Sequence, residues 1–131
     1  MILEKSVSRL IENSSILNEN GDISIWNEGI VPISLINKMV EIRKIKSENY
    51  NINIKNWSVE EHASRIAYFI LQKEIEPIQL IQIFNHPFYS NGDFIIHDGF
   101  HRLTSYFISN RETIPCKLID GFTEDFTEFL N

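Results

Sequence analysis

Residues 93–103 read Asp-Phe-Ile-Ile-His-Asp-Gly-Phe-His-Arg-Leu, and this segment carries the strongest local pattern in the chain. Its first half is apolar and rich in isoleucine, which predicts a strand over residues 94–97 that is buried on at least one face. Gly99 breaks the strand, and Leu103, Tyr106 and Phe107 then recur at a helical spacing. The segment therefore predicts a strand that turns at Gly99 directly into a helix.

A strand-to-helix turn of this kind is a candidate anion site. Glycine lets the backbone approach a ligand closely, and the first N–H groups and the dipole of a helix favour negative charge. Arg102 adds a planar fork suited to phosphate oxygens, and His101 adds a second donor. Asp98 is a candidate helix cap, or a ligand for a metal that accompanies the phosphates. Alternatively, Asp98 only caps the helix, Arg102 pairs with a surface carboxylate and His101 packs.

The clearest helix begins after Ser58, upstream of this turn. Ser58 and Glu61 have the spacing of a capping box, and an apolar stripe carries the helix to about residue 72. Pro77 bars its continuation. His62 falls on the flank of the helix away from the stripe, so we expect it on the surface.

Pattern and turn residues predict the remaining elements. We expect strands at 78–84 and 113–119, a tight turn at 90–93, a helix stop at Asn110 and a closing turn at 120–121. The phenylalanines at 122, 126 and 129 predict a short final helix with an apolar face. Towards the N-terminus we expect a helix from residue 2 that ends at the Asn/Ser-rich stretch from Asn13, strands at 23–26 and 30–36, and an irregular or partly helical connection over 37–54. The whole predicts one α+β domain, in which a mixed β-sheet is flanked by helices.

Composition bounds the class of protein. The chain has 131 residues, 43% hydrophobic and 23% charged, which is ordinary for one folded domain. No apolar run approaches the roughly 20 residues needed to cross a bilayer, so we expect no membrane partner. Cys116 is the one cysteine and cannot form an internal disulfide, which makes a reducing cytoplasm the default expectation.

The charge balance counts against a nucleic-acid partner. The formal net charge is −6, whereas a domain that neutralises phosphates usually carries excess Lys and Arg on one face. The basic residues cluster only at 43–46, between Glu41 and Glu48, where a solvated helix or loop is the better explanation. We therefore expect no binding to duplex DNA.

Several segments together resemble the ParB/sulfiredoxin superfamily. Its members carry a strand, a Gly-x-(Arg/His)-Arg box that opens a helix, and a later Ile-Pro-Val-like strand, which match residues 94–97, 99–102 and 114–116. Glu76-Pro77-Ile78 looks like the family's Gln-Pro-Ile strand, and residues 31–36 resemble its first strand. The resemblance implies a ParB/sulfiredoxin-like core over 30–120, with an extension over 1–29 and a C-terminal helix over 121–131.

In this superfamily the box binds nucleotide phosphates: CTP in chromosome-partitioning ParB proteins, ATP in sulfiredoxins and an adenine nucleotide in free-serine kinases. The resemblance thus implies that Gly99, Phe100, His101 and Arg102 bind ATP or CTP. Phe100 stands where sulfiredoxins need their cysteine, and Cys116 lies on a later strand, which argues against reductase chemistry.

The form Asp-Gly-x-His-Arg is closest to the serine-kinase-like branch. It implies a phosphotransferase or nucleotide hydrolase that acts on a small molecule or a protein, with Asp98 holding Mg²⁺ and assisting catalysis together with His101. In that branch an acidic residue after the first strand is the catalytic base, and Glu41 falls near that position, with Arg43 as a further phosphate contact. Glu41 as a solvated loop charge is the alternative. Glu76 and His86 are second choices, His86 because it lies on a loop.

A catalytically silent binding module is the competing function on the same fold, for example an immunity protein, an inhibitor or a regulatory subunit. An acidic and aromatic C-terminal helix would suit docking of a protein partner or a second copy. Nuclease activity is least favoured because of the negative charge.

Overall fold

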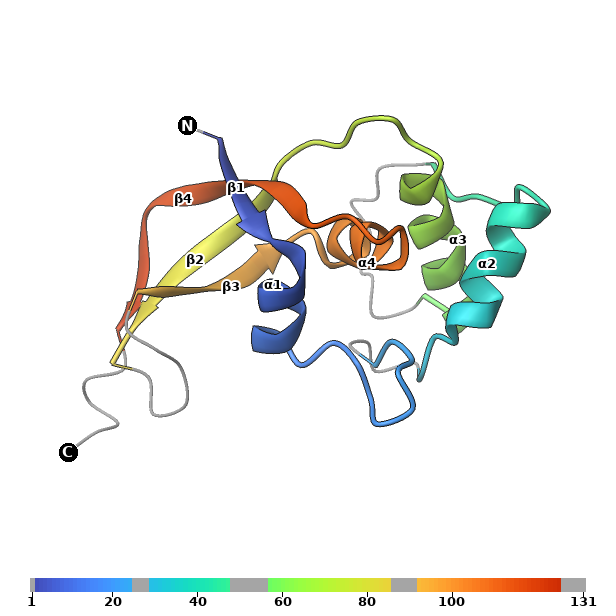
Figure 1. Ribbon diagram of the computed structural model, residues 1–131, viewed down its shortest axis with the longest axis horizontal. Helices are drawn as coiled ribbons and strands as arrows, with labels where there is room; N and C mark the ends of the chain where they lie inside the picture. The colour runs from blue at the N-terminus through green and yellow to red at the C-terminus, as the bar shows by residue number, and fades with distance from the viewer. Residues whose placement is uncertain (1, 25–28, 48–56, 86–91, 126–131) are drawn as a thin grey trace.

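Four strands and four helices make up the part of the chain that the structure describes (Figure 1). The computed structural model describes residues 2–24, 29–47, 57–85 and 92–125, with side chains up to residue 119. The elements follow in the order β1 (Leu3–Ser6), α1 (Val7–Asn13), α2 (Ile33–Glu41), α3 (Val59–Ile70), β2 (Ile78–Phe84), β3 (Asp93–Asp98), α4 (Phe100–Ile108) and β4 (Thr113–Asp125). The predicted α+β class is confirmed.

The strands form one mixed sheet in the order β1-β4-β2-β3. β2 pairs antiparallel with β3 and parallel with β4, and β1 pairs antiparallel with the start of β4. Figure 1 shows the sheet at one end of the molecule and α4, α3 and α2 side by side towards the other, with α1 beside β1 and β3. The pairing of Gln79 with Asp98 brings the end of β3, and so the Gly99 turn, against the start of β2.

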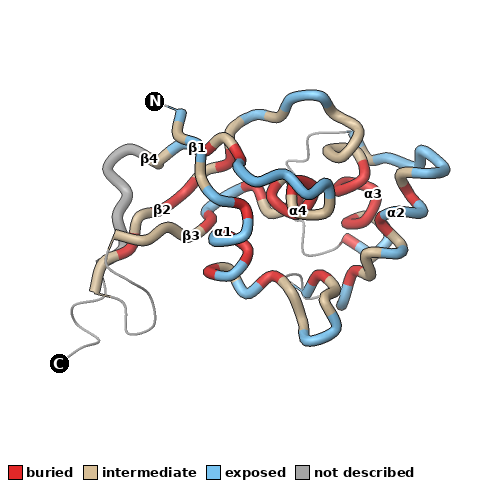
Figure 2. The backbone as a smooth tube through the Cα atoms, in the orientation of Figure 1, coloured by how far each residue is buried: buried red, intermediate tan, exposed pale blue. Residues whose placement is uncertain are grey.

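The hydrophobic core runs from the sheet through α4 to α3 and α2, as the buried stretches in Figure 2 show. Its fully buried members include Ile36, Ile66, Leu80, Leu103 and Ile114. Within the described residues, no helix is both long enough and apolar enough to cross a membrane.

Helix α3 confirms the predicted capping box and corrects the prediction for His62. The Ser58 hydroxyl accepts the Glu61 N–H at 3.1 Å, and the Glu61 carboxylate accepts the Ser58 N–H at 3.2 Å. The surface position expected for His62 is wrong, because its ring is fully buried. Since α3 packs against α2 on one side and α4 on another, residues 62–67 are all buried and the helix has no single exposed flank there.

The strand predicted at 30–36 is also wrong, since α2 begins at Ile33. Val31 does form a bridge with Ile23, but Pro32 then serves as the helix N-cap. The Ile33 N–H donates to the Asp22 carboxylate at 3.1 Å, so a side chain 11 residues upstream caps the helix. Burial of Ile36 and Met39 on one helix face outweighs the β propensity of the branched residues.

Two further predictions fail at the ends of the sheet. Residues 3–6 form β1 rather than the first turn of a helix, because they find partners at 113–116. β4 does not close at residues 120–121 but continues to Asp125, beside Phe84 of β2. The predicted C-terminal helix is therefore wrong up to residue 125, and its last six residues, 126–131, lie outside the described part of the chain.

Three helices end on a non-glycine residue with left-handed backbone: Ser15 after α1, Arg43 after α2 and Asn110 after α4, with φ of 51°, 54° and 58°. At the end of α2 the Arg43 N–H donates to the Val40 carbonyl and the Lys44 N–H to the Met39 carbonyl, the two bonds of a Schellman motif. The same pair of bonds follows α4, which confirms the helix stop predicted at Asn110. Glycine is the residue usually found at this position because it has no Cβ.

Replacing Arg43 with glycine is therefore expected to stabilise the protein by about 0.5–1 kcal/mol, since it relieves the left-handed conformation. Arg43→Ala is the matched control, because alanine loses the same charge but keeps the steric cost. Chemical denaturation of the three proteins measures the difference. Equal stability of the glycine and alanine variants would contradict the prediction.

Candidate functional site

The Gly99 turn is held against the first residue of β2. Gly99 is the N-cap of α4, with φ of 119° and ψ of 24°. A Cβ added to it would lie 2.5 Å from Cγ2 and 2.7 Å from Cβ of Ile78, which is closer than real Cβ atoms approach. Glycine is thus required here both by backbone conformation and by the close approach of two elements.

Arg102 ties this turn to the chain that enters β2. Its Nη1 donates to the carbonyls of Glu76 and Pro77, each at 3.0 Å, and its Nη2 donates to Asp98 Oδ2 at 3.3 Å. The arginine side chain is 13% exposed and the Asp98 side chain 66%. Within the described part of the chain, these bonds leave the Nε hydrogen and one Nη2 hydrogen of Arg102 for a ligand.

Asp98 does not take the role of helix cap proposed from the sequence. The N-cap is Gly99, which has no side chain, and the Asp98 carboxylate turns to Arg102 instead. Of the alternative reading, the helix cap by Asp98 is wrong, but Arg102 does pair with a surface carboxylate, which is Asp98 itself.

His101 points into the interior between α3 and α4. Its Nε2 lies 3.0 Å from Nδ1 of His62, and the two rings stack at 5.2 Å with 16° between their planes. Trp57 lies beside both rings: the centroid of its ring is 5.5 Å from that of His62 and 5.8 Å from that of His101. Burial holds the pKa of His101 well below its usual value, and the charges of His62, Arg65 and Arg102 act in the same direction. The ring therefore packs as a neutral imidazole.

Sequence reasoning missed Trp57 and His62 as neighbours of the box. The two histidines are 39 residues apart, so no local spacing marks them as partners. The only sequence signal was that each histidine lies near the start of an expected helix: His62 follows the capping box, and His101 follows Gly99.

The carboxylates proposed as catalytic base occupy different regions. Glu76 is exposed and its own carbonyl binds Arg102, so the structure brings Glu76, Asp98 and Arg102 together. Glu41 is the exposed last residue of α2 and Arg43 follows it, while α3 lies between α2 and α4 in Figure 1. His86 lies outside the described residues.

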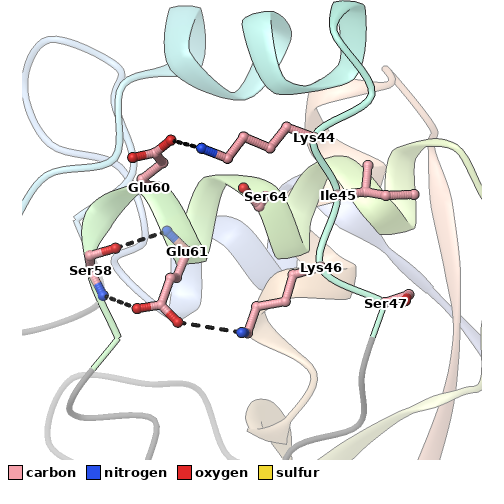
Figure 3. Close-up of a pocket in the computed structure, with 8 residues that line it drawn as sticks. All are labelled: Lys44, Ile45, Lys46, Ser47, Ser58, Glu60, Glu61 and Ser64. Carbon is pink, nitrogen blue, oxygen red and sulfur yellow. Dashed lines mark hydrogen bonds and ion pairs between the residues drawn. The ribbon is translucent and has the colours of Figure 1, made fainter.

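A surface pocket of about 370 Å³ lies between residues 44–47 and the first turns of α3 (Figure 3). Lys44 pairs there with Glu60, and Lys46 Nζ lies 3.4 Å from Glu61 Oε2. The bond from Lys44 lowers the pKa of Glu60, and the bond from the Ser58 N–H lowers that of Glu61. Each lysine is thus neutralised by a carboxylate, so this pocket is a poorer phosphate site than the Gly99 turn.

Two further features bear on metal binding and on the single thiol. No group of three or more His, Cys, Asp or Glu side chains that could hold a metal occurs among the residues described. Mg²⁺ at Asp98 stays a prediction. Cys116 is buried on β4, and burial raises the pKa of its thiol to about 11, so the thiol stays protonated at neutral pH.

No protein-family model and no curated protein sequence matches the chain. The likeness to the ParB/sulfiredoxin superfamily therefore stays a prediction.

The close contact between Gly99 and Ile78 predicts how strongly a side chain at position 99 would destabilise the fold. Gly99→Ala is expected to destabilise the protein by about 3 kcal/mol or more, because it adds a steric clash to an unfavourable backbone conformation. Gly21→Ala is the matched control: Gly21 has φ of 81°, but an added Cβ meets nothing within 4 Å, so it should cost only about 1 kcal/mol. Denaturant unfolding measures both, and equal losses would show that the close approach to Ile78 has no energetic role.

Proposed function

We propose that the chain binds the phosphate groups of a nucleotide, ATP or CTP, at the Gly99 turn. The observation that carries the proposal is the position of Arg102: its Nη2 lies 3.3 Å from where a Cβ of Gly99 would be. An immobilised guanidinium thus stands beside the first N–H groups of α4, which Gly99 leaves without a side-chain cap.

The bonds that Arg102 makes support binding rather than oppose it. Two carbonyls fix the plane of the guanidinium, so a ligand need not restrict a flexible side chain. Asp98 is a neighbouring negative charge, and its largely exposed carboxylate can turn away from Arg102 or share a Mg²⁺ ion with the phosphates. The expected contacts are backbone N–H groups of residues 100–102 and the remaining hydrogens of Arg102.

The reaction that this arrangement suits is phosphoryl transfer to a small molecule or protein, or hydrolysis of the nucleotide. Phosphoryl transfer needs alignment and charge stabilisation more than covalent chemistry from the protein. Glu76 takes first place as the base because its backbone touches Arg102, and Glu41 becomes the second candidate. The cytoplasm is the expected compartment, since it keeps a free thiol such as Cys116 reduced.

A specific observation also favours the second candidate function, a silent binding module. Three of the bonds of Arg102 are spent within the protein, and the His101 ring is buried against His62. Both residues therefore have a structural role that would keep the box even if catalysis were absent.

Nucleotide binding is tested by thermal stability with ATP, CTP, ADP and GTP, with and without Mg²⁺. A ligand at 100 times its dissociation constant should stabilise the wild type by about 2.7 kcal/mol. Arg102→Ala should lose most of this gain, and Arg102→Lys should lose part because it keeps the charge without the fork. Arg111→Ala, an exposed arginine just beyond α4, is the control that should keep it.

Arg102→Ala also removes two bonds to the chain before β2, so each variant is compared with its own ligand-free form. Absence of a shift in the wild type with every nucleotide would refute the binding proposal.

Catalysis is tested by phosphate release and transfer at saturating nucleotide. Glu76→Gln should keep nucleotide binding and lower the rate by about 10²–10⁴-fold, the usual contribution of a general base. Glu41→Gln is the matched control, with the same change of charge at the end of α2. A larger loss of rate in Glu41→Gln than in Glu76→Gln would assign the role of general base to Glu41. If the wild type binds nucleotide but shows no turnover, the chain is a silent binding module.

A further inference from the structure

A buried pair of histidines joins the first turns of α3 and α4. His62 is 0% and His101 5% exposed, and their facing nitrogens lie 3.0 Å apart. At this distance one ring must donate a hydrogen and the other must accept it, so only one of the two facing nitrogens carries a proton. The contact therefore requires at least one neutral ring.

The surroundings of the pair disfavour a positive charge. The positive charges of Arg65 in α3 and Arg102 in α4 repel a proton on the His101 ring and so lower its pKa. Lys46, in the segment 44–47, places its Nζ 4.8 Å from the centroid of the Trp57 ring. Trp57 in turn lies beside the rings of His62 and His101. Among the described residues, Glu61 directly precedes His62, and its carboxylate is engaged by Lys46 and by the Ser58 N–H. A proton added to the pair would place like charges together in a desolvated space.

The pair lies directly behind the candidate site. His101 precedes Arg102 in the first turn of α4, and Gly99 begins that turn. His62 holds the ring of His101 from α3, so the stacking of the two rings fixes how the first turn of α4 sits against its neighbour. Loss of the contact would move the N–H groups expected to bind phosphate.

We propose that the His62–His101 pair is a proton-sensitive tie, whose protonation separates the first turns of α3 and α4 and lowers the affinity of the Gly99 turn for a nucleotide. The effect on affinity rests on the proposed function, whereas the opening of the tie does not.

The direction of the pH dependence follows from proton binding. Burial keeps the pKa of His101 well below its usual value of 6.5. Below about pH 6.5 the opened form therefore binds more protons than the closed form. Above that pH the closed form has its full stability relative to the opened form. As the pH falls further, the equilibrium constant for closing decreases by up to about tenfold per pH unit for each proton taken up on opening.

Trp57 reports the opening without any nucleotide. The chain has two tryptophans, so a Trp26→Phe background leaves Trp57 as the sole tryptophan, whose emission is followed with excitation selective for tryptophan. Trp57 is 5% exposed and touches both rings, so separation of the turns should shift its emission to the red. Between pH 8 and 5 we expect this shift with a midpoint below about 6.5, while the far-ultraviolet circular dichroism stays constant.

The decisive variant combines His62→Asn with His101→Gln. The asparagine amide takes the place of Nδ1 and the glutamine amide that of Nε2, so a hydrogen bond can persist although neither group titrates in this range. Its emission should be flat from pH 8 to 5. His97→Gln is the matched control, because His97 is exposed on β3, and it should keep the transition. A cooperative unfolding transition at pH 7.5 verifies that the double variant folds. If it does not fold, the His62→Asn single variant replaces it, and the midpoint of its pH-dependent emission shift should differ from that of the wild type.

Affinity for ATP is then measured at pH 7.5 and 5.5. We expect it to fall about tenfold or more in the wild type beyond the change seen in the double variant, which corrects for protonation of ATP itself. An unaltered transition in the double variant, or a wild-type transition that coincides with loss of circular dichroism, would overturn the tie. Equal ratios of affinity in the two proteins would overturn the regulation. The same measurement is made with CTP if ATP does not bind. If neither nucleotide binds at either pH, the proposed function and its regulation both fall, and Trp57 emission still decides whether the pair opens.

Discussion

The backbone of Gly99 rests on Ile78 with no space for a side chain between them, and the rest of the arrangement depends on this contact. It brings together the end of β3, the start of β2 and the first turn of α4. Once α4 starts there, Arg102 reaches the two carbonyls before β2, and His101 is directed towards α3. The proposed binding role and the structural role therefore fall on the same few residues, and a substitution in the box alters the fold and the candidate site together.

The sequence predicted those elements whose determinants lie within a few residues of one another. The capping box at Ser58, the strand at Ile78–Phe84 and the turn at Gly99 all have local causes: reciprocal side-chain bonds, an apolar β-branched run and a residue without Cβ. The prediction failed where the cause is distant. Asp22 caps α2 from 11 residues away, and the residues of β1 become a strand only because β4 lies beside them.

The candidate site divides in the same way. Its residue types and their order around Gly99 were readable, because glycine, arginine and a helix start form one short pattern. The partners that decide what each side chain does were not readable. Arg102 binds backbone carbonyls, which every sequence contains, and His101 meets a histidine that the helical pattern placed on the surface. Burial of α3 on two sides is a property of helix packing, which the period of one helix does not reveal.

The pairing of β1 with β4 also bears on how the chain reaches its native state. Residues 3–6 find their hydrogen-bonding partners at 113–116, beyond every helix of the described chain. Such non-local contacts slow folding, because the entropy of closing a long loop is lost before the contacts form. During synthesis the helices and the β2–β3 hairpin can form early, whereas the first strand must wait for β4 to emerge. The edge of β4 that β1 covers is thus the last part of the sheet to be closed.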